Sequence, residues 1–128
     1  MQSPGRPLPA LPSFRFPREE RLKGRGDIRG VFNRGRRVSC SGAALFFRGN
    51  GLAHNRIAFT FARKYGNAVE RNRARRLGRE AYRYMRNRLK GGFDLVLLVY
   101  PGKDTLTGRQ EQLKVLFSKA GLCMGSGR

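Results

Sequence analysis

Large apolar side chains occupy every second position of residues 56–63, which is the period of a β-strand. Residues 43–48 have a similar character and predict a neighbouring strand. Between the two segments, Gly49-Asn50-Gly51 is strong turn chemistry. The pattern therefore predicts two strands paired as an antiparallel hairpin with a loop of several residues.

The two faces of this predicted hairpin differ in the size of their side chains. Ile57, Phe59 and Phe61 would face the core, and the opposite face would carry small Ala58 and Thr60. The first strand would add an aromatic ring and a cation to that open face, namely Phe46 and Arg48. Such a surface is typical of sites for unpaired bases. Two interpretations stay open for Phe46, which are base stacking and packing under the first helix.

Two short helices are predicted near the ends of the chain. The first is expected to be capped by Asp27, to carry apolar side chains including Phe32, and to end before Gly35. The last is expected to begin at Thr107 and has an apolar stripe at helical spacing. Residues 93–100 are a continuous apolar run, which is typical of a central or parallel strand buried on both faces.

The longest predicted helix begins at Asn67, which together with Glu70 has the spacing of a capping box, and it ends at Gly91-Gly92. The expected buried stripe consists of Leu77, Ala81, Tyr84 and Met85. Basic side chains cluster on another face: Arg71, Arg75, Arg79, Arg83, Arg86 and Lys90. The element order α-β-β-α-β-α predicts an α/β (α+β) two-layer sandwich, in which this helix connects the second strand to the third.

The chain is predicted to hold one folded domain between two tails. Residues 1–20 contain five of the six prolines and are expected to be flexible. The folded domain is expected to run over residues 21–121, and residues 122–128 are expected to be a flexible C-terminus.

Charge is the most unusual property of the composition. Lys and Arg number 28 against 8 Asp and Glu, which gives a formal net charge of +20. This excess indicates a polyanionic partner, with nucleic acid ahead of an anionic membrane surface. No apolar run approaches the roughly 20 residues of a membrane span, and no signal peptide is recognisable, so a cytoplasmic protein is expected. Cys40 and Cys123 form no CxxC pair and are expected to be reduced.

The acidic residues do not have the spacing of a catalytic site. No DxD or ExxE pair occurs on a common face, no P-loop is present, and the only histidine, His54, lies in the predicted hairpin loop. We therefore expect that the polypeptide alone catalyses no reaction.

Residues 64–80 read Lys-Tyr-Gly-Asn-Ala-Val-Glu-Arg-Asn-Arg-Ala-Arg-Arg-Leu-Gly-Arg-Glu. This segment, with the upstream Arg21-Leu22-Lys23 and the short Phe-bearing helix, resembles the signature of the bacterial ribonuclease P protein subunit. The resemblance implies a small sandwich with a left-handed crossover around the arginine-rich helix. It also implies a protein that binds the catalytic RNA and the 5′ leader of precursor tRNA, and so assists removal of the leader.

In this family the RNA binds the catalytic Mg²⁺ and performs the hydrolysis, so no metal is expected on the protein. The implied assembly is one protein with one RNA, and no membrane is involved. The alternative is a structural RNA-binding protein, ribosomal or chaperone-like, without a processing role.

The helix pattern and the resemblance together assign two sets of site residues. The set expected to bind the RNA subunit is Lys64, Asn67, Arg71, Asn72, Arg73, Arg75, Arg76, Arg79 and Arg83. The set expected to bind the leader is Ile28, Phe32, Phe46, Arg48, Ala58 and Thr60. Many relatives have a phenylalanine where this chain has Ile28, and an aliphatic side chain offers no π face to a base.

Overall fold

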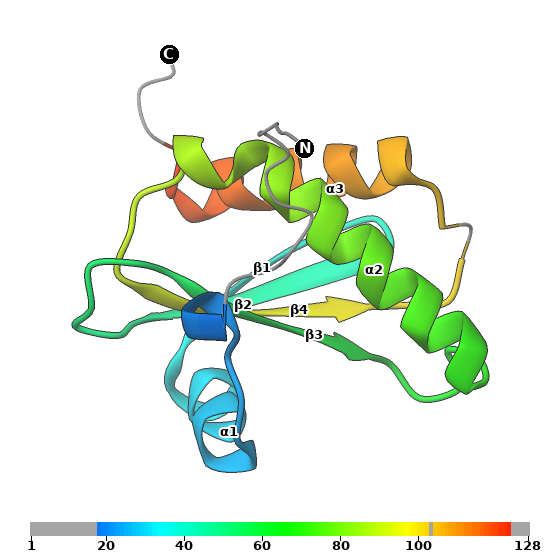
Figure 1. Cartoon of the computed structure of the whole chain (residues 1–128), viewed down its shortest axis with the longest axis horizontal. Helices are drawn as coiled ribbons and strands as arrows, with labels where there is room; N and C mark the ends of the chain where they lie inside the picture. Colours follow the sequence, from blue (N-terminus) through cyan, green and yellow to red (C-terminus); the bar gives the residue numbers. More distant parts are fainter. Residues whose placement is uncertain (1–17, 103, 124–128) are drawn as a thin grey trace, which may run out of the picture.

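A computed structural model describes residues 18–102 and 104–123 of the chain. A mixed sheet lies between two helical layers, with α2 and α3 on one face and α1 on the other (Figure 1). The strands are β1 (Arg36–Cys40), β2 (Ala43–Gly49), β3 (Arg56–Phe61) and β4 (Phe93–Val99). The helices are α1 (Arg25–Arg34), α2 (Ala68–Met85) and α3 (Leu106–Ala120), with short 3-10 turns at Arg18–Glu20 and Arg86–Arg88.

The strand order β1-β2-β4-β3 shows that the predicted hairpin is wrong. β4 lies between β2 and β3, antiparallel to the former and parallel to the latter, so Val96 pairs with both Phe46 and Ala58. The prediction of a central, partly parallel strand at residues 93–100 is thereby confirmed. The hairpin partner of β2 is β1, which the apolar pattern did not reveal and which joins β2 through Ser41 and Gly42, the latter at φ +85°.

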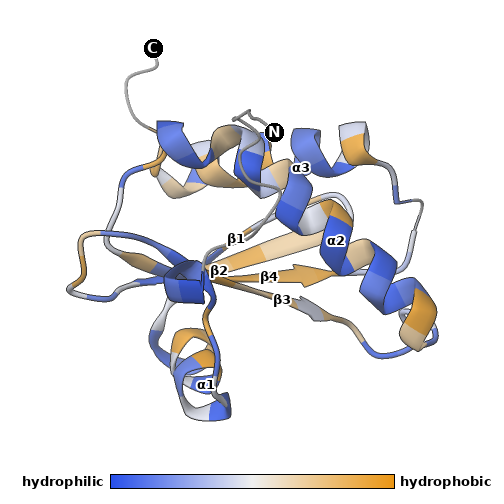
Figure 2. Cartoon of the chain, viewed as in Figure 1, coloured by the Kyte–Doolittle hydropathy of each residue, from blue (hydrophilic) through white to orange (hydrophobic). Residues whose placement is uncertain are grey.

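The alternation of side chains between the two faces of the sheet is confirmed. The larger core lies between the sheet and helices α2 and α3; from the strands it takes Leu45, Phe47, Ile57, Phe59, Leu95 and Leu97. The smaller core lies on the α1 face and contains Leu22, Val31, Ala58 and Val96, with Ile28, Phe32 and Phe46 packed against it. Figure 2 shows apolar strands under an α2 that is hydrophilic along most of its length.

The capping box that begins α2 is confirmed. The Glu70 amide donates to Asn67 Oδ1, and the Asn67 amide donates to Glu70 Oε1, both at 2.9 Å. The predicted end is wrong, because the α-helix stops at Met85 and a 3-10 turn follows. The predicted stripe is also partly wrong, since α2 buries Ala74, Gly78, Ala81 and Tyr82 while Tyr84 is 59% exposed.

The other helix starts also differ from the prediction. α1 begins at Arg25 after Gly24, so Asp27 lies in the first turn and makes no capping hydrogen bond. α3 begins at Leu106, one residue before the predicted start, and its cap is Thr105, whose Oγ1 accepts from the Gly108 amide at 3.0 Å. The predicted end of α1 is confirmed, because the Gly35 amide donates to the Val31 carbonyl at 2.8 Å.

Both ends of the folded domain reach slightly further than residues 21–121. Glu20 pairs with Arg86 at 3.2 Å, and buried Leu122 accepts a hydrogen bond from the Lys90 amide at 2.7 Å. Residues 1–17 and 124–128 of the two predicted tails lie outside the described residues. Among residues 18–102 and 104–123, no helix has the length and apolar character needed to cross a membrane.

Candidate nucleic-acid interface

The loop that leads into α2 is held by a polar network. Lys64 has φ 66° and Gly66 has φ 153°, so the chain turns sharply before the helix cap. Between them, buried Tyr65 donates its hydroxyl hydrogen to Asp104, which also accepts from the buried guanidinium of Arg109 in α3. This network fixes the loop, and therefore the start of α2, against the beginning of α3. The sequence does not reveal this network, because Asp104 and Arg109 lie 39 and 44 residues after Tyr65 in the chain.

The cations of α2 form what we call the arginine surface: Arg71, Arg73, Arg75, Arg76, Arg79 and Arg83. Two of these guanidinium groups lie over aromatic rings, Arg75 at 5.2 Å from the Phe61 centroid and Arg83 at 5.6 Å from the Tyr84 centroid. Arg75 also donates to Asn72 Oδ1 at 2.9 Å. These contacts orient planar donors that suit bidentate binding of phosphate oxygens.

The arginine surface concentrates charge of one sign. Burial lowers the pKa of Arg79, and the neighbouring cations Arg21 and Arg75 lower it further. The two acids of α2 are already engaged, Glu70 in the capping box and Glu80 in an ion pair with Arg83 at 3.0 Å. A polyanion bound here would relieve the repulsion among these arginines.

The structure brings the nine residues expected to bind the RNA subunit together on α2 and its preceding loop. Two further cations do not extend this helix face as expected. Arg86 lies in the 3-10 turn and pairs with Glu20, and Lys90 lies beyond that turn.

An aromatic pair lies on the opposite face of the sheet, where α1 crosses β2. The rings of Phe32 and Phe46 are 4.6 Å apart at an interplanar angle of 63°, and the Arg37 guanidinium lies 5.7 Å from the Phe46 centroid. Both phenylalanines are half-buried, and Ile28 packs beside them. The packing of Phe46 under α1 is thereby confirmed, and base stacking by its accessible portion stays a prediction.

The remaining residues of the predicted leader set differ in exposure. Ala58 is only 9% exposed and lies in the small core with Leu22 and Val31. The prediction that Ala58 lies on an open face is therefore wrong. Thr60, the next residue of β3 on this face, is half-buried and donates to the Leu97 carbonyl at 3.2 Å. Arg48 is exposed, and its side chain lies against Gly30 of α1.

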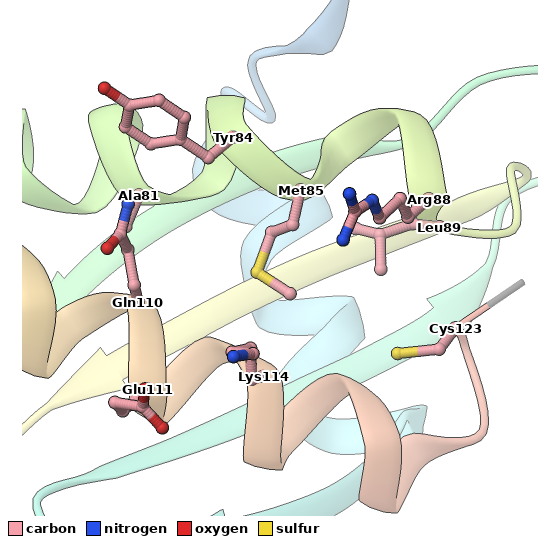
Figure 3. Close-up of a pocket in the computed structure, with 9 residues that line it drawn as sticks. All are labelled: Ala81, Tyr84, Met85, Arg88, Leu89, Gln110, Glu111, Lys114 and Cys123. Carbon is pink, nitrogen blue, oxygen red and sulfur yellow. The ribbon is translucent and has the colours of Figure 1, made fainter. Parts of the chain in front are cut away.

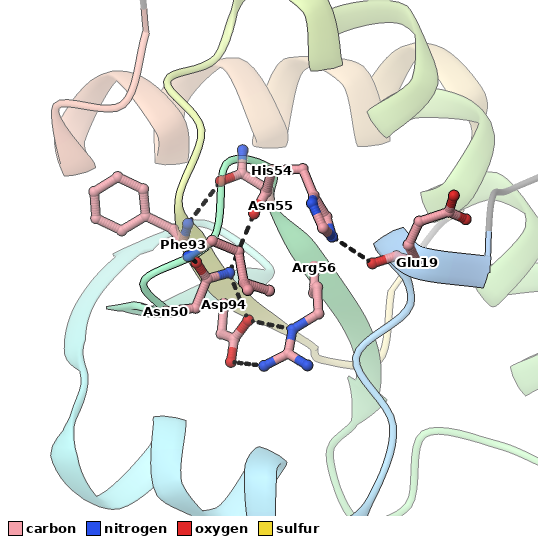
Figure 4. A network of polar contacts seen from close by, with 8 residues as sticks. Glu19, Asn50, His54, Asn55, Arg56, Phe93 and Asp94 are labelled. Carbon is pink, nitrogen blue, oxygen red and sulfur yellow. Dashed lines mark hydrogen bonds and ion pairs between the residues drawn. The ribbon is translucent and has the colours of Figure 1, made fainter.

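A second polar network lies at the end of the sheet where β3 and β4 begin (Figure 4). Arg56 forms a two-point contact with Asp94, from Nε at 2.8 Å and from Nη2 at 2.7 Å, and Asn50 donates to the same carboxylate at 3.0 Å. Buried Asn55 donates to the Lys90 carbonyl and accepts from the Phe93 amide, each at 2.8 Å. His54 contacts the Glu19 carbonyl at 3.0 Å through Nε2. The network ties the loop after β2 to β4, so these polar groups have structural partners.

An open groove lies between the end of α2 and α3, with Tyr84, Met85 and Leu89 on one side and Gln110, Glu111 and Lys114 on the other (Figure 3). No residue of either predicted site set lines it. Among the residues that the structure describes, no group of three or more His, Cys, Asp or Glu side chains is placed to hold a metal ion.

Comparison with known proteins gives one family. The family described as Ribonuclease P matches residues 16–121. The ribonuclease P protein component of Nitrosococcus oceani is 39% identical over 93 residues, covering 72% of this chain and 77% of the relative. That of Dictyoglomus thermophilum is 36% identical over 91 residues, covering 71% and 76%.

Solved structures agree with this result. The RNase P protein from Thermotoga maritima superposes with a TM-score of 0.69 at 29% identity, covering 78% of this chain and 96% of that one. The Staphylococcus aureus RNase P protein gives a TM-score of 0.71 at 21% identity, covering 81% and 97%, which supports the fold. The left-handed sense of the crossover that connects β3 to β4 through α2 stays a prediction.

Proposed function

The chain belongs to the ribonuclease P protein family, and from this membership we propose which RNA each of its two surfaces binds. The arginine surface binds the catalytic RNA, and the α1 face of the sheet around Phe32 and Phe46, which we call the cleft, binds the 5′ leader of precursor tRNA. The observation that carries the proposal is the arginine surface itself, six cations on one helix whose own acids are engaged within the protein.

We place the hydrolysis on the RNA partner, with Mg²⁺ held mainly by that RNA. The supporting observation is that several carboxylates of the described residues are engaged in contacts that hold the fold. Asp94 pairs with Arg56, Glu20 with Arg86, and Asp104 with Tyr65 and Arg109. In this proposal one protein joins one RNA in the cytoplasm, and the protein positions substrate and partner.

Reconstitution tests the first part of the proposal. The protein is mixed with a bacterial ribonuclease P RNA, and cleavage of precursor tRNA is followed at low Mg²⁺. Cleavage should be faster than with the RNA alone, and the absence of any gain would refute the proposal. Replacing the exposed pair Arg73 and Arg76 by alanine should reduce the slope of log affinity against log salt by about 1 to 2, because each lost phosphate contact removes close to one released counterion.

The Phe46→Ala variant tests the cleft. Loss of a base–aromatic contact should weaken binding of leader-bearing precursor about 5- to 20-fold and leave mature tRNA unchanged. Val115→Ala is the control, because Val115 is an exposed apolar residue of α3 that belongs to neither predicted site set. Equal losses for precursor and mature tRNA would remove Phe46 from the leader site. A structural RNA-binding protein without a processing role would show the salt dependence and no dependence on the leader.

A further inference from the structure

The α1 face of the sheet opens beyond the aromatic pair. Under α1, Val96 is fully buried and Ala58 is 9% exposed. Two residues further along β4 and β3 on the same face are Leu98 and Thr60, which pair with each other in the parallel ladder and are both half-buried. The face is therefore more exposed at Leu98 and Thr60 than at Val96 and Ala58, although Ala44, the partner of Leu98 on β2, is fully buried.

Tyr100 follows directly after β4 and is the next residue in the alternation on this face. Its amide donates to the Gly42 carbonyl at 3.0 Å, so the ladder continues one residue beyond Val99. Val99 belongs to the core on the α2 and α3 face, and strand alternation therefore places Tyr100 on the same face as Val96 and Leu98. The Tyr100 side chain is 37% exposed, so an aromatic ring lies at the open end of the cleft.

Cations surround this end of the cleft. The ladder between β3 and β4 also continues, because the Ala62 amide donates to the Val99 carbonyl at 2.9 Å. Arg63 and Lys64 follow directly and are exposed. On the other side, Gly102 lines a pocket with Tyr65, Arg73 and the two acids Glu70 and Asp104, so the segment after Tyr100 reaches the start of the arginine surface.

An aromatic platform flanked by cations is the usual composition of a site for single-stranded nucleic acid. We propose that Tyr100 is a second base-stacking residue for the leader, at the end of the cleft that joins the arginine surface. This inference rests on the proposed function of the cleft and adds a contact to it. Phe46 pairs with Val96, four residues before Tyr100, so the two rings are separated along the strand by about 13 Å. That distance corresponds to about four nucleotides at the 3.4 Å interval of stacked bases, and to fewer in an extended strand.

The test uses the reconstituted holoenzyme and precursor tRNAs whose leaders increase in length one nucleotide at a time. Tyr100→Ala and Tyr100→Leu should each weaken binding of leader-bearing precursor about 5- to 20-fold, because both remove the π face. Tyr100→Phe should bind as the unaltered protein does, as should the control Val115→Ala. Mature tRNA should bind equally to all of them. The leader length at which the loss first appears should differ by about two to four nucleotides between Tyr100→Ala and Phe46→Ala.

Several outcomes would overturn this inference. If Tyr100→Leu binds precursor as Tyr100→Phe does, the residue contributes bulk and no stacking. If mature tRNA loses affinity equally, Tyr100 contacts something other than the leader. If Phe46→Ala reduces leader-dependent binding while Tyr100→Ala does not, the second contact is wrong and the proposed function stands. If neither variant does so, both are wrong. Thermal unfolding of each variant establishes that the losses do not come from a misfolded protein.

Discussion

Gly78 sets how closely the arginine-bearing helix approaches the sheet. The residue is buried on α2, and a Cβ built on it would lie 2.7 Å from both Cδ1 and Cε1 of Phe59 on β3. Real Cβ atoms do not come so close to a ring carbon, so a Gly78→Ala change requires the ring or the helix to move. Phe59 is only 8% exposed, and the surrounding core leaves the ring little room.

The net effect of Gly78→Ala follows from two opposing free energies. Alanine in a helix interior is favoured over glycine by about 1 kcal/mol. Overpacking of a well-filled core costs about 1 to 3 kcal/mol. We expect the overpacking to exceed the gain, with a net loss of up to about 2 kcal/mol in the free energy of unfolding. This corresponds to a lower Tm by about 4 to 8 °C for each kcal/mol.

Urea denaturation of the free protein measures this loss, and Gly26→Ala is the matched control. Gly26 lies in α1, and a Cβ there would meet no atom within 4 Å. The same substitution should therefore stabilise the protein at this position, by up to about 1 kcal/mol. If Gly78→Ala stabilises the protein as Gly26→Ala does, the close contact between α2 and Phe59 is wrong.

Two further predictions concern the stability of α2. Asn67→Ala removes the oxygen that accepts from the Glu70 amide and should lower the free energy of unfolding by about 1 kcal/mol, as measured by urea denaturation. Asn67→Ser keeps a side-chain acceptor and should retain most of the stability. Equal losses in the two variants would contradict a capping role. Burial raises the pKa of Tyr82 to about 12 from its usual 10, because the ionised phenolate is disfavoured in the fold. The unfolded chain therefore loses this proton at a lower pH than the folded protein does. Tyr82 should leave the free energy of unfolding unchanged below pH 10 and lower it between pH 10 and 12, by about 2 to 3 kcal/mol at the limit. Urea denaturation across this range should show a steeper fall of the free energy of unfolding with pH in the unaltered protein than in Tyr82→Phe, and equal falls in the two proteins would contradict the raised pKa of Tyr82.

Local patterns predicted those features that depend on neighbouring residues in the sequence. The assignment of Ile57 and Ala58 to opposite faces is correct, because a strand has a period of two wherever it lies in a sheet. The capping box of Asn67 and Glu70 is correct for the same reason, since its hydrogen bonds span three residues. The pairing of strands was not available locally, because β4 begins more than 30 residues after β3 ends and still lies between β2 and β3.

The buried side of α2 was predicted less well, because the projection gave most weight to large apolar side chains and placed the buried stripe at Leu77 and Tyr84. The helix approaches the sheet through the small residues Ala74 and Gly78. The network of Tyr65, Asp104 and Arg109 could not be foreseen either, since only the fold brings the starts of α2 and α3 together. The chemistry of the arginine surface was predictable, because it depends on one continuous helix.

The position of β4 between β2 and β3 determines when the fold can be completed during synthesis. The β1–β2 hairpin joins neighbouring segments and can form as soon as both have left the ribosome. β3 has no strand partner until residues 93–99 emerge, and until then α2 has only part of a sheet to pack on. Pairing of segments so distant in the chain is slow to form, and β4 is synthesised after the whole of α2. A nascent chain therefore displays its arginines before it holds them in place, and selective RNA binding requires that β4 has already paired.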